Sequence, residues 1–117
     1  MTILDTNVVV ERVKRKEKIE EDITALTLVE FPKVVSYERF YGNIVYPEEE
    51  DFELASKVQL ELLNRGKPQD PVDVLIASIA VNLNEDLMTY DEDFLYIKEA
   101  MKSLGYDMKL LYLGKRS

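Results

Sequence analysis

Short apolar runs alternate with longer segments of mixed polarity along the chain. This alternation predicts buried parallel strands joined by helices, because a connection between parallel neighbours needs about a dozen residues and is usually a helix. The predicted strands are residues 2–5, 22–26, 43–46, 87–90 and, at one edge, 108–113. The predicted helices are residues 7–16, 27–31, 34–41, 47–65, 71–83 and 94–104. The pattern therefore indicates an α/β fold with a central parallel sheet and right-handed crossovers.

Polar residues and prolines mark where several of these helices begin or end. Thr27 and Glu30 fit a capping box, in which Ser or Thr is followed three residues later by Glu or Gln. Pro32 predicts a break soon afterwards, because proline removes a backbone hydrogen bond. The acidic run 48–51 after Pro47 is interpreted as the first turn of a helix and not as a metal site. The capping box alone would account for Glu30.

The first predicted helix, capped by Thr6 or Asn7, ends in a basic cluster. Positive charge complements the negative end of the helix dipole, so a solvated helix terminus is one interpretation. A contact with nucleic acid or a protein partner is the other. The cluster consists of Arg12, Lys14, Arg15, Lys16 and Lys18.

The helix predicted over 71–83 is apolar on nearly every side, which is typical of a buried helix. Asp70 caps it and Pro71 begins it. Asp73 lies in its first turn, close to the end of the fourth predicted strand. A carboxylate in such a setting needs a partner. The positive end of the helix dipole could be that partner, but a metal ion explains the position of Asp73 better.

Four acidic residues are expected at the same edge of the sheet. Asp5, Glu30 and Asp91 follow the first, second and fourth predicted strands, and Asp73 opens the helix that leads into the fourth strand. The carboxyl ends of parallel strands form the edge where ligands bind. Two carboxylates about 4 Å apart repel by roughly 4 kcal/mol at an effective dielectric constant near 20. A bound cation or raised pKa values would make such a cluster tolerable.

Composition limits the chemistry further. A length of 117 residues predicts one domain spanning 1–117. No apolar run approaches the length of a membrane span, and the N-terminus does not resemble a signal peptide, so a cytoplasmic protein is the default expectation. The chain has no Cys and no His, which excludes disulfides, thiolate and imidazole zinc sites, and a histidine general base. Any metal ion must be held by oxygen, which favours Mg²⁺ or Mn²⁺, with Ca²⁺ possible.

The net charge of −8 argues against broad electrostatic attraction to nucleic acid. A nucleic-acid partner would need a local basic patch, a bridging cation, or both.

Four short motifs together resemble the signature of PIN-domain ribonucleases, and most closely that of VapC toxins from prokaryotic VapBC toxin–antitoxin pairs. The resemblance spans the whole chain, and the motifs occur in the family's order and spacing. It implies a three-layer αβα PIN-like fold with four or five parallel strands in the order 3-2-1-4-5. It also implies a Mg²⁺- or Mn²⁺-dependent endoribonuclease that cleaves single-stranded or structured RNA. The motifs are Ile-Leu-Asp-Thr-Asn at 3–7, Thr-Leu-Val-Glu at 27–30, Asp-Val-Leu-Ile-Ala at 73–77 and Thr-Tyr-Asp-Glu-Asp-Phe at 89–94.

The resemblance also assigns roles to individual residues. Asp5, Asp73 and Asp91 would hold one or two metal ions, directly or through water, and Glu30 would orient or deprotonate the attacking water. Asp93 matches a further acid near the metal. The residues that match the polar supports of the family are Asn7 and Thr89. Sequence alone does not choose among Arg12, Lys14 and Arg15 as contacts to the RNA backbone.

A homodimer and a VapB-type antitoxin partner are also implied by the resemblance. The segment 31–46 independently predicts an adhesive surface, because it is rich in apolar and aromatic residues. The alternative is that these side chains complete the domain core. The residues concerned are Phe31, Val34, Val35, Tyr37, Phe40, Tyr41, Val45 and Tyr46.

Three other functions fit parts of the sequence. A phosphoacceptor receiver domain needs paired acids at the end of the first strand, an Asp ending the third and a lysine ending the fifth, whereas here the first strand ends in a single acid, the third in Val-Tyr-Pro at 45–47 and the last in Leu-Leu-Tyr-Leu at 110–113. A non-catalytic PIN-like interaction module needs a damaged set of acids, and the set is complete here. A PIN nuclease of RNA processing, outside any toxin pair, is not distinguished from a toxin by the sequence. An antitoxin reading frame immediately upstream would distinguish them.

Overall fold

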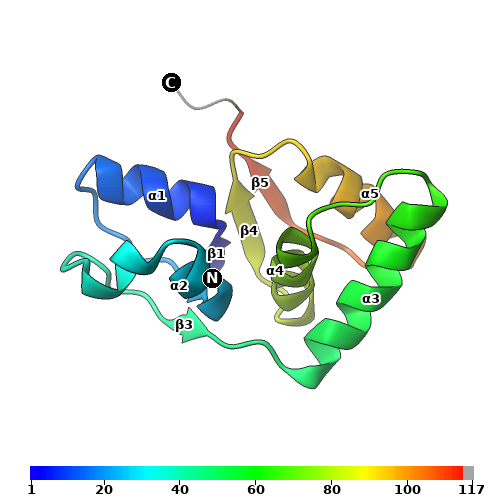
Figure 1. The fold of residues 1–117 in the computed structure, drawn as a ribbon, viewed down its shortest axis with the longest axis horizontal. Helices are drawn as coiled ribbons and strands as arrows, with labels where there is room; N and C mark the ends of the chain where they lie inside the picture. The colour runs from blue at the N-terminus through cyan, green and yellow to red at the C-terminus, as the bar shows by residue number, and fades with distance from the viewer. Residues whose placement is uncertain (115–117) are drawn as a thin grey trace.

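The structure, a computed structural model, describes residues 1–114. Strands and helices alternate along most of the chain, and helices lie on both sides of the strands (Figure 1). The elements in chain order are β1 (Thr2–Leu4), α1 (Thr6–Lys14), β2 (Ile23–Thr24), α2 (Ala25–Glu30), the 3₁₀ helix η1 (Pro32–Ser36), β3 (Ile44–Val45), α3 (Glu49–Asn64), α4 (Pro71–Asn82), β4 (Asp86–Thr89), α5 (Phe94–Ser103) and β5 (Leu110–Tyr112).

The strands are parallel, as predicted, but they divide into two sheets. The main sheet has the order β1-β4-β5, with β5 at its edge, and β2 and β3 form a separate pair. The expected single sheet of four or five strands is therefore wrong for residues 1–114. β2 is only two residues long because α2 begins directly after it. Asp22, the residue before β2, forms a single parallel bridge with Ile3 of β1, in which Leu4 N donates to Asp22 O and Asp22 N donates to Thr2 O, both at 2.9 Å.

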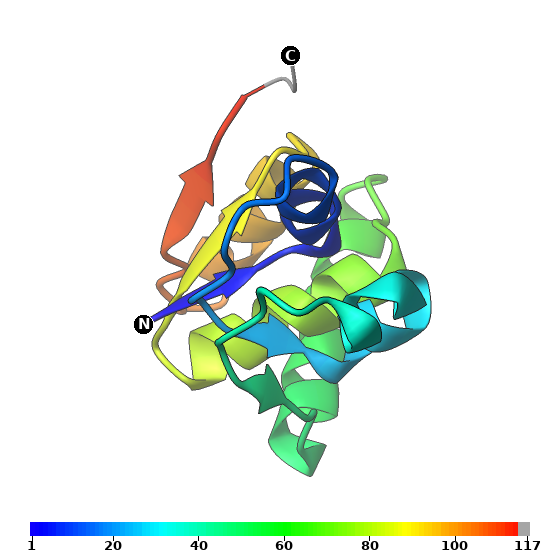
Figure 2. The same ribbon diagram turned by 90° about the vertical axis from the view of Figure 1, so that its left-hand side faces the viewer.

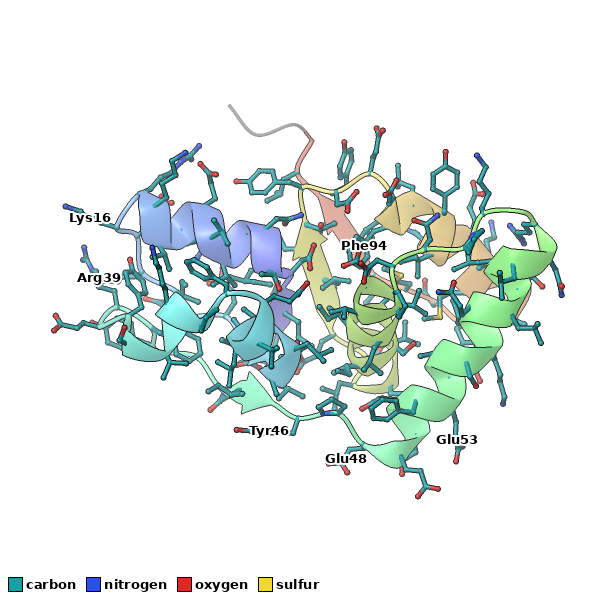
Figure 3. The ribbon with its side chains drawn as sticks, in the orientation of Figure 1. Lys16, Arg39, Tyr46, Glu48, Glu53 and Phe94 are labelled. Atoms are coloured by element: carbon teal, nitrogen blue, oxygen red, sulfur yellow. The ribbon has the colours of Figure 1, made fainter. Side chains whose placement is uncertain are left out.

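Two apolar cores lie on opposite faces of the central strands. Successive side chains of a strand point to opposite faces, so Ile3 joins one core and its neighbour Leu4 joins the other. The first core packs against α3, α4 and α5 and contains Phe94, the first residue of α5, which is labelled in Figure 3. The second core packs against α1 and η1. Figure 2 views the molecule from the side of α1 and α2.

Helix α4 agrees with its prediction. Asp70 caps it by accepting a hydrogen bond from Val72 N at 2.8 Å, and Pro71 is its first residue. Every residue from Val74 to Ala80 is buried. The helix thereby presents Asp73, in its first turn, beside the ends of β1 and β4. No helix within residues 1–114 is long and apolar enough to cross a membrane.

Three predicted helix starts need correction. Asp5 itself caps α1, by accepting from Thr6 N at 2.8 Å, in place of Thr6 or Asn7. The capping box of Thr27 and Glu30 is wrong, because α2 starts at Ala25 and both residues lie inside it. Helix α3 starts at Glu49, two residues after Pro47, although the acidic run does cap it as predicted.

The helix predicted over 34–41 is also wrong. Pro32 ends α2 as expected and begins η1, which stops at Ser36. The chain then continues without regular structure to β3. Gly42 does not end a helix but lies against the backbone of Glu21. A Cβ at this position would be 1.8 Å from the Glu21 carbonyl oxygen, so only glycine fits.

Candidate active site

An open cleft of about 320 Å³ lies at the carboxyl ends of β1 and β4. The four acids predicted to act together all contribute to its wall. Each comes from a different part of the fold: the end of β1, the end of α2, the first turn of α4 and the turn after β4. The lining residues are Asp5, Thr6, Asn7, Val10, Glu30, Asp73 and Asp91.

Asp5 is held in place at both carboxylate oxygens. Its Oδ1 accepts from Thr6 N and its Oδ2 accepts from the Thr89 hydroxyl, each at 2.8 Å. The side chain is buried. Burial raises the pKa of Asp5 from 3.8 to about 6, with smaller increases from the charges of Glu30 and Asp91, while the two hydrogen bonds oppose the rise. Asp5 is therefore fixed in position, while its burial disfavours the ionised carboxylate.

Thr89 connects Asp5 to the turn that carries Asp91. Besides donating to Asp5, its hydroxyl accepts from Asp91 N at 3.0 Å and from Asn7 Nδ2 at 3.4 Å. Asn7 also accepts at Oδ1 from Tyr90 N at 3.3 Å. Thr89 and Asn7 thus lie where polar supports of the site were predicted.

Asp73 is the acid with the most strongly shifted pKa. The side chain is half-buried, and within residues 1–114 no hydrogen-bond donor reaches its carboxylate. Burial is the largest cause of the shift, and neighbouring negative charges add to it, so the pKa rises from 3.8 to about 8. Positive charge in the cleft would offset both effects. The contributing acids are Asp5, Asp70, Asp91 and Glu30.

Glu30 reaches the cleft from the C-terminal end of α2. Its Oε1 accepts from the Thr6 hydroxyl at 2.6 Å. The same hydroxyl lies 2.8 Å from the hydroxyl of Thr27. Glu30 is therefore hydrogen-bonded to the start of α1.

Asp93 stands apart from the other acids. Its side chain is exposed and does not line the cleft. Its backbone N donates to Asp91 Oδ1 at 2.9 Å, which orients the Asp91 carboxylate. Burial, followed by the charges of Asp91 and Glu92, raises the pKa of Asp93. The structure thus brings Asp5, Glu30, Asp73 and Asp91 together and leaves the Asp93 carboxylate at the rim.

The donor set fits a hard divalent cation. The cleft offers only oxygen ligands, and burial, with a smaller contribution from the neighbouring negative charges, raises the pKa values of Asp5 and Asp73. Among residues 1–114, no three acidic side chains are arranged so that all three could coordinate one metal ion. Mg²⁺ commonly takes one or two carboxylates and keeps several waters, so this looser arrangement is compatible with it.

The basic cluster of α1 lies away from this cleft. The helix is about 13 Å long, and its N-terminal end forms the cleft wall while Lys16 lies beyond the opposite end (Figure 3). Arg12 pairs with Glu21 at 2.8 Å and donates to Lys18 O at 3.0 Å. Arg15 lies 3.5 Å from Glu11. None of the lining residues is basic.

The aromatic segment 31–46 is divided between core and surface. Tyr37 and Phe40 are half-buried against the second core, and the Tyr37 hydroxyl donates to Glu17 O at 2.5 Å. Val35 and Tyr46 are 71% and 62% exposed, and Figure 3 shows Tyr46 pointing away from the fold. The predicted adhesive surface is therefore smaller than the segment and excludes its most deeply packed rings.

Two residues of the site were missed by the sequence interpretation. Thr6 and Thr27 were considered only as helix caps. Thr6 in fact lines the cleft, and the Thr27 hydroxyl is hydrogen-bonded to that of Thr6. The position of Thr6 directly after Asp5 was the available signal. Nothing in the sequence indicated that Thr27 faces α1.

The fold is similar to that of chains in solved VapBC structures. No protein-family profile matches the chain, and no curated protein matches its sequence. Solved structures do match. A chain of a VapBC complex from nontypeable Haemophilus influenzae gives a TM-score of 0.70 at 19% identity, over 95% of this chain and 96% of that one. DNA-bound VapBC from Salmonella typhimurium gives 0.73 at 18% identity, over 93% and 95%.

FitAcB from Neisseria gonorrhoeae is similar as well, with a TM-score of 0.66 at 20% identity over 95% of this chain and 96% of that one. The resemblance stated from the sequence motifs is thereby confirmed at the level of the fold.

Proposed function

We propose that this chain is a Mg²⁺- or Mn²⁺-dependent endoribonuclease and the toxin of a toxin–antitoxin pair. The observation that supports the proposal most directly is the half-buried Asp73 carboxylate, which has no hydrogen-bond donor within residues 1–114 and faces other acids. A cation would remove this repulsion. The similarity in fold to VapBC chains favours the same function.

Each acid has a distinct task in this proposal. Asp5, Asp73 and Asp91 hold one or two ions, directly or through bound water, with Asp5 and Asp91 oriented by Thr89 and by Asp93 N. When bound, the ion supplies an acidified water and charge stabilisation at the scissile phosphate. Glu30 lies at the mouth of the cleft, where its free carboxylate oxygen can orient the attacking water or take its proton.

RNA must be positioned by residues outside the acidic cleft. Of the three basic residues considered from the sequence, Arg12 and Arg15 are ion-paired, whereas Lys14 is exposed and makes no ion pair within residues 1–114. We therefore favour Lys14 as a contact to the RNA backbone, which fixes register without reading sequence.

A VapB-type antitoxin and a second copy of this chain are the proposed protein partners. The neighbouring structures are VapBC complexes. The exposed apolar side chains of 31–46 would provide contact surface, since aromatic residues are enriched at interface cores. They include Val35, Tyr41 and Tyr46.

Cleavage of an end-labelled single-stranded RNA tests the nuclease assignment. Protein stripped with EDTA should be inactive, and Mg²⁺ or Mn²⁺ should restore cleavage. Asp73→Asn should abolish it without unfolding the chain, since no hydrogen bond to this carboxylate is lost. Asp86→Asn is the matched control, because Asp86 begins β4 at the opposite edge of the sheet. Wild-type cleavage by Asp73→Asn would contradict the proposal.

A further inference from the structure

Three side chains form a chain of hydrogen bonds that leads from the wall of the cleft into the fold. The Thr6 hydroxyl lies 2.6 Å from Glu30 Oε1 and 2.8 Å from the Thr27 hydroxyl. Thr6 comes from the first turn of α1, while Thr27 and Glu30 lie one turn apart on α2. Thr27 is fully buried and is not part of the cleft wall.

Counting protons fixes the direction of these bonds. An ionised carboxylate only accepts hydrogen bonds, and a hydroxyl has a single proton to donate. The Thr6 proton therefore points to Glu30, so Thr27 must be the donor to Thr6. This arrangement also gives the buried Thr27 hydroxyl an acceptor, which a buried polar group requires.

The position of Glu30 explains why such support matters. Glu30 is exposed and is the last residue of α2, where the negative end of the helix dipole disfavours a carboxylate. Its long side chain has much rotamer freedom to lose on being fixed. The bond to Thr6 draws the carboxylate away from its own helix terminus and towards the positive end of α1.

We propose that Thr27 is a positioning residue, which orients the Thr6 hydroxyl and through it holds the Glu30 carboxylate at the cleft. The Thr-x-x-Glu motif then serves as a relay between two helices and not as a helix cap. The effect on catalysis rests on the proposed nuclease function, but the effect on Glu30 geometry does not.

Isosteric substitutions separate the relay from packing. Thr27→Val removes the hydroxyl and keeps the shape, and Thr27→Ser restores the hydroxyl. Thr24→Val is the matched control, because Thr24, the last residue of β2, is equally buried and its Oγ1 has no hydrogen-bond partner within residues 1–114. Far-UV circular dichroism and urea unfolding verify that all three variants fold.

The first measurement is the set of Hα–Hβ couplings of Glu30 by NMR in metal-free protein. Thr27→Val should give rotamer-averaged couplings, whereas Thr27→Ser and Thr24→Val should keep the wild-type values. The second measurement is RNA cleavage. Thr27→Val should lower kcat about three- to tenfold with KM unchanged, the effect of losing one hydrogen bond, and Thr27→Ser should recover it.

Wild-type couplings and kcat in Thr27→Val would overturn the relay. So would a loss in Thr24→Val equal to that in Thr27→Val, because general packing would then account for both. If the wild-type protein cleaves no RNA, the nuclease proposal fails, yet the Glu30 couplings still decide whether the relay exists.

Discussion

The Thr89 hydroxyl donates to Asp5 Oδ2 at 2.8 Å, although the two residues are 84 positions apart in the chain. The Thr89 hydroxyl oxygen in turn accepts a hydrogen bond from Asp91 N. One hydroxyl therefore couples the end of β1 to the turn after β4 and fixes two of the clustered acids relative to each other. β1 and β4 are hydrogen-bonded neighbours, which is what allows this contact.

Removing the Thr89 hydroxyl should change the charge state of Asp5. The hydrogen bond favours the ionised carboxylate, so Thr89→Val should raise the pKa of Asp5 above its present value of about 6. The expected rise is about one unit, since a bond to a charged group contributes about 1.5 kcal/mol or more. A carbon-detected NMR titration of metal-free protein measures it. Thr89→Ser is the control and should titrate like wild type; an unchanged pKa in Thr89→Val would mean that the bond is weak.

Asp73 should make the metal-free protein less stable as the pH rises. Burial and four nearby carboxylates raise its pKa from 3.8 to about 8 in the folded state. Between those values the folded chain holds a proton that the unfolded chain has released, so the free energy of unfolding falls with rising pH.

Asp73→Asn should therefore raise the free energy of unfolding at pH 7 by about 2 kcal/mol, roughly half of what the full pKa shift would give, because solvent screens this partly exposed carboxylate, and should leave it unchanged near pH 4. Urea denaturation across this range, in EDTA, measures the difference. An equal gain at both pH values would show that the substitution acts through packing and not through charge.

The elements that sequence predicted well are those specified by local signals. Helix α4 was predicted because Asp70 caps it, Pro71 begins it and an apolar run fills it. These signals also located Asp73 at the start of a buried helix. The same logic placed Asp5 and Asp91 after strands that the structure contains.

The elements that sequence predicted poorly depend on tertiary contacts. Ile-Thr-Ala-Leu at 23–26 suits either a strand or a helix, and the structure changes from one to the other at Ala25. That change moved Thr27 from a cap position into a helix that faces α1. Whether Tyr37 and Phe40 are core or surface also depended on how η1 packs, which no periodic pattern revealed.

Divalent ions should stabilise the protein only if the acids of the cleft are intact. A ligand that binds the folded state at a hundredfold excess over its Kd adds about 2.7 kcal/mol to the free energy of unfolding. Mn²⁺ should therefore raise the melting temperature of wild type and of the control Asp86→Asn, but not that of Asp73→Asn. Equal shifts in all three proteins would place the ion elsewhere.

The aromatic rings of residues 31–46 should separate into core and surface when a charge is introduced at each. Phe40 packs against the second core, so Phe40→Asp should lower the free energy of unfolding by about 2–3 kcal/mol, through lost apolar burial and a poorly solvated carboxylate. Tyr46 is 62% exposed, so Tyr46→Asp should change it by no more than about 0.5 kcal/mol. Urea unfolding provides both values.

The same pair of variants tests where the proposed dimer forms. If the exposed rings carry the contact, Tyr46→Asp should shift sedimentation at micromolar concentration from dimer to monomer while the Mn²⁺-dependent rise in melting temperature persists, because the cleft is untouched. Phe40→Asp, examined where it remains folded, should keep the dimer. The reverse result, a stable Phe40→Asp monomer and a dimeric Tyr46→Asp, would place Phe40 in the interface and not in the core. A wild-type chain that sediments strictly as a monomer would exclude the dimer altogether.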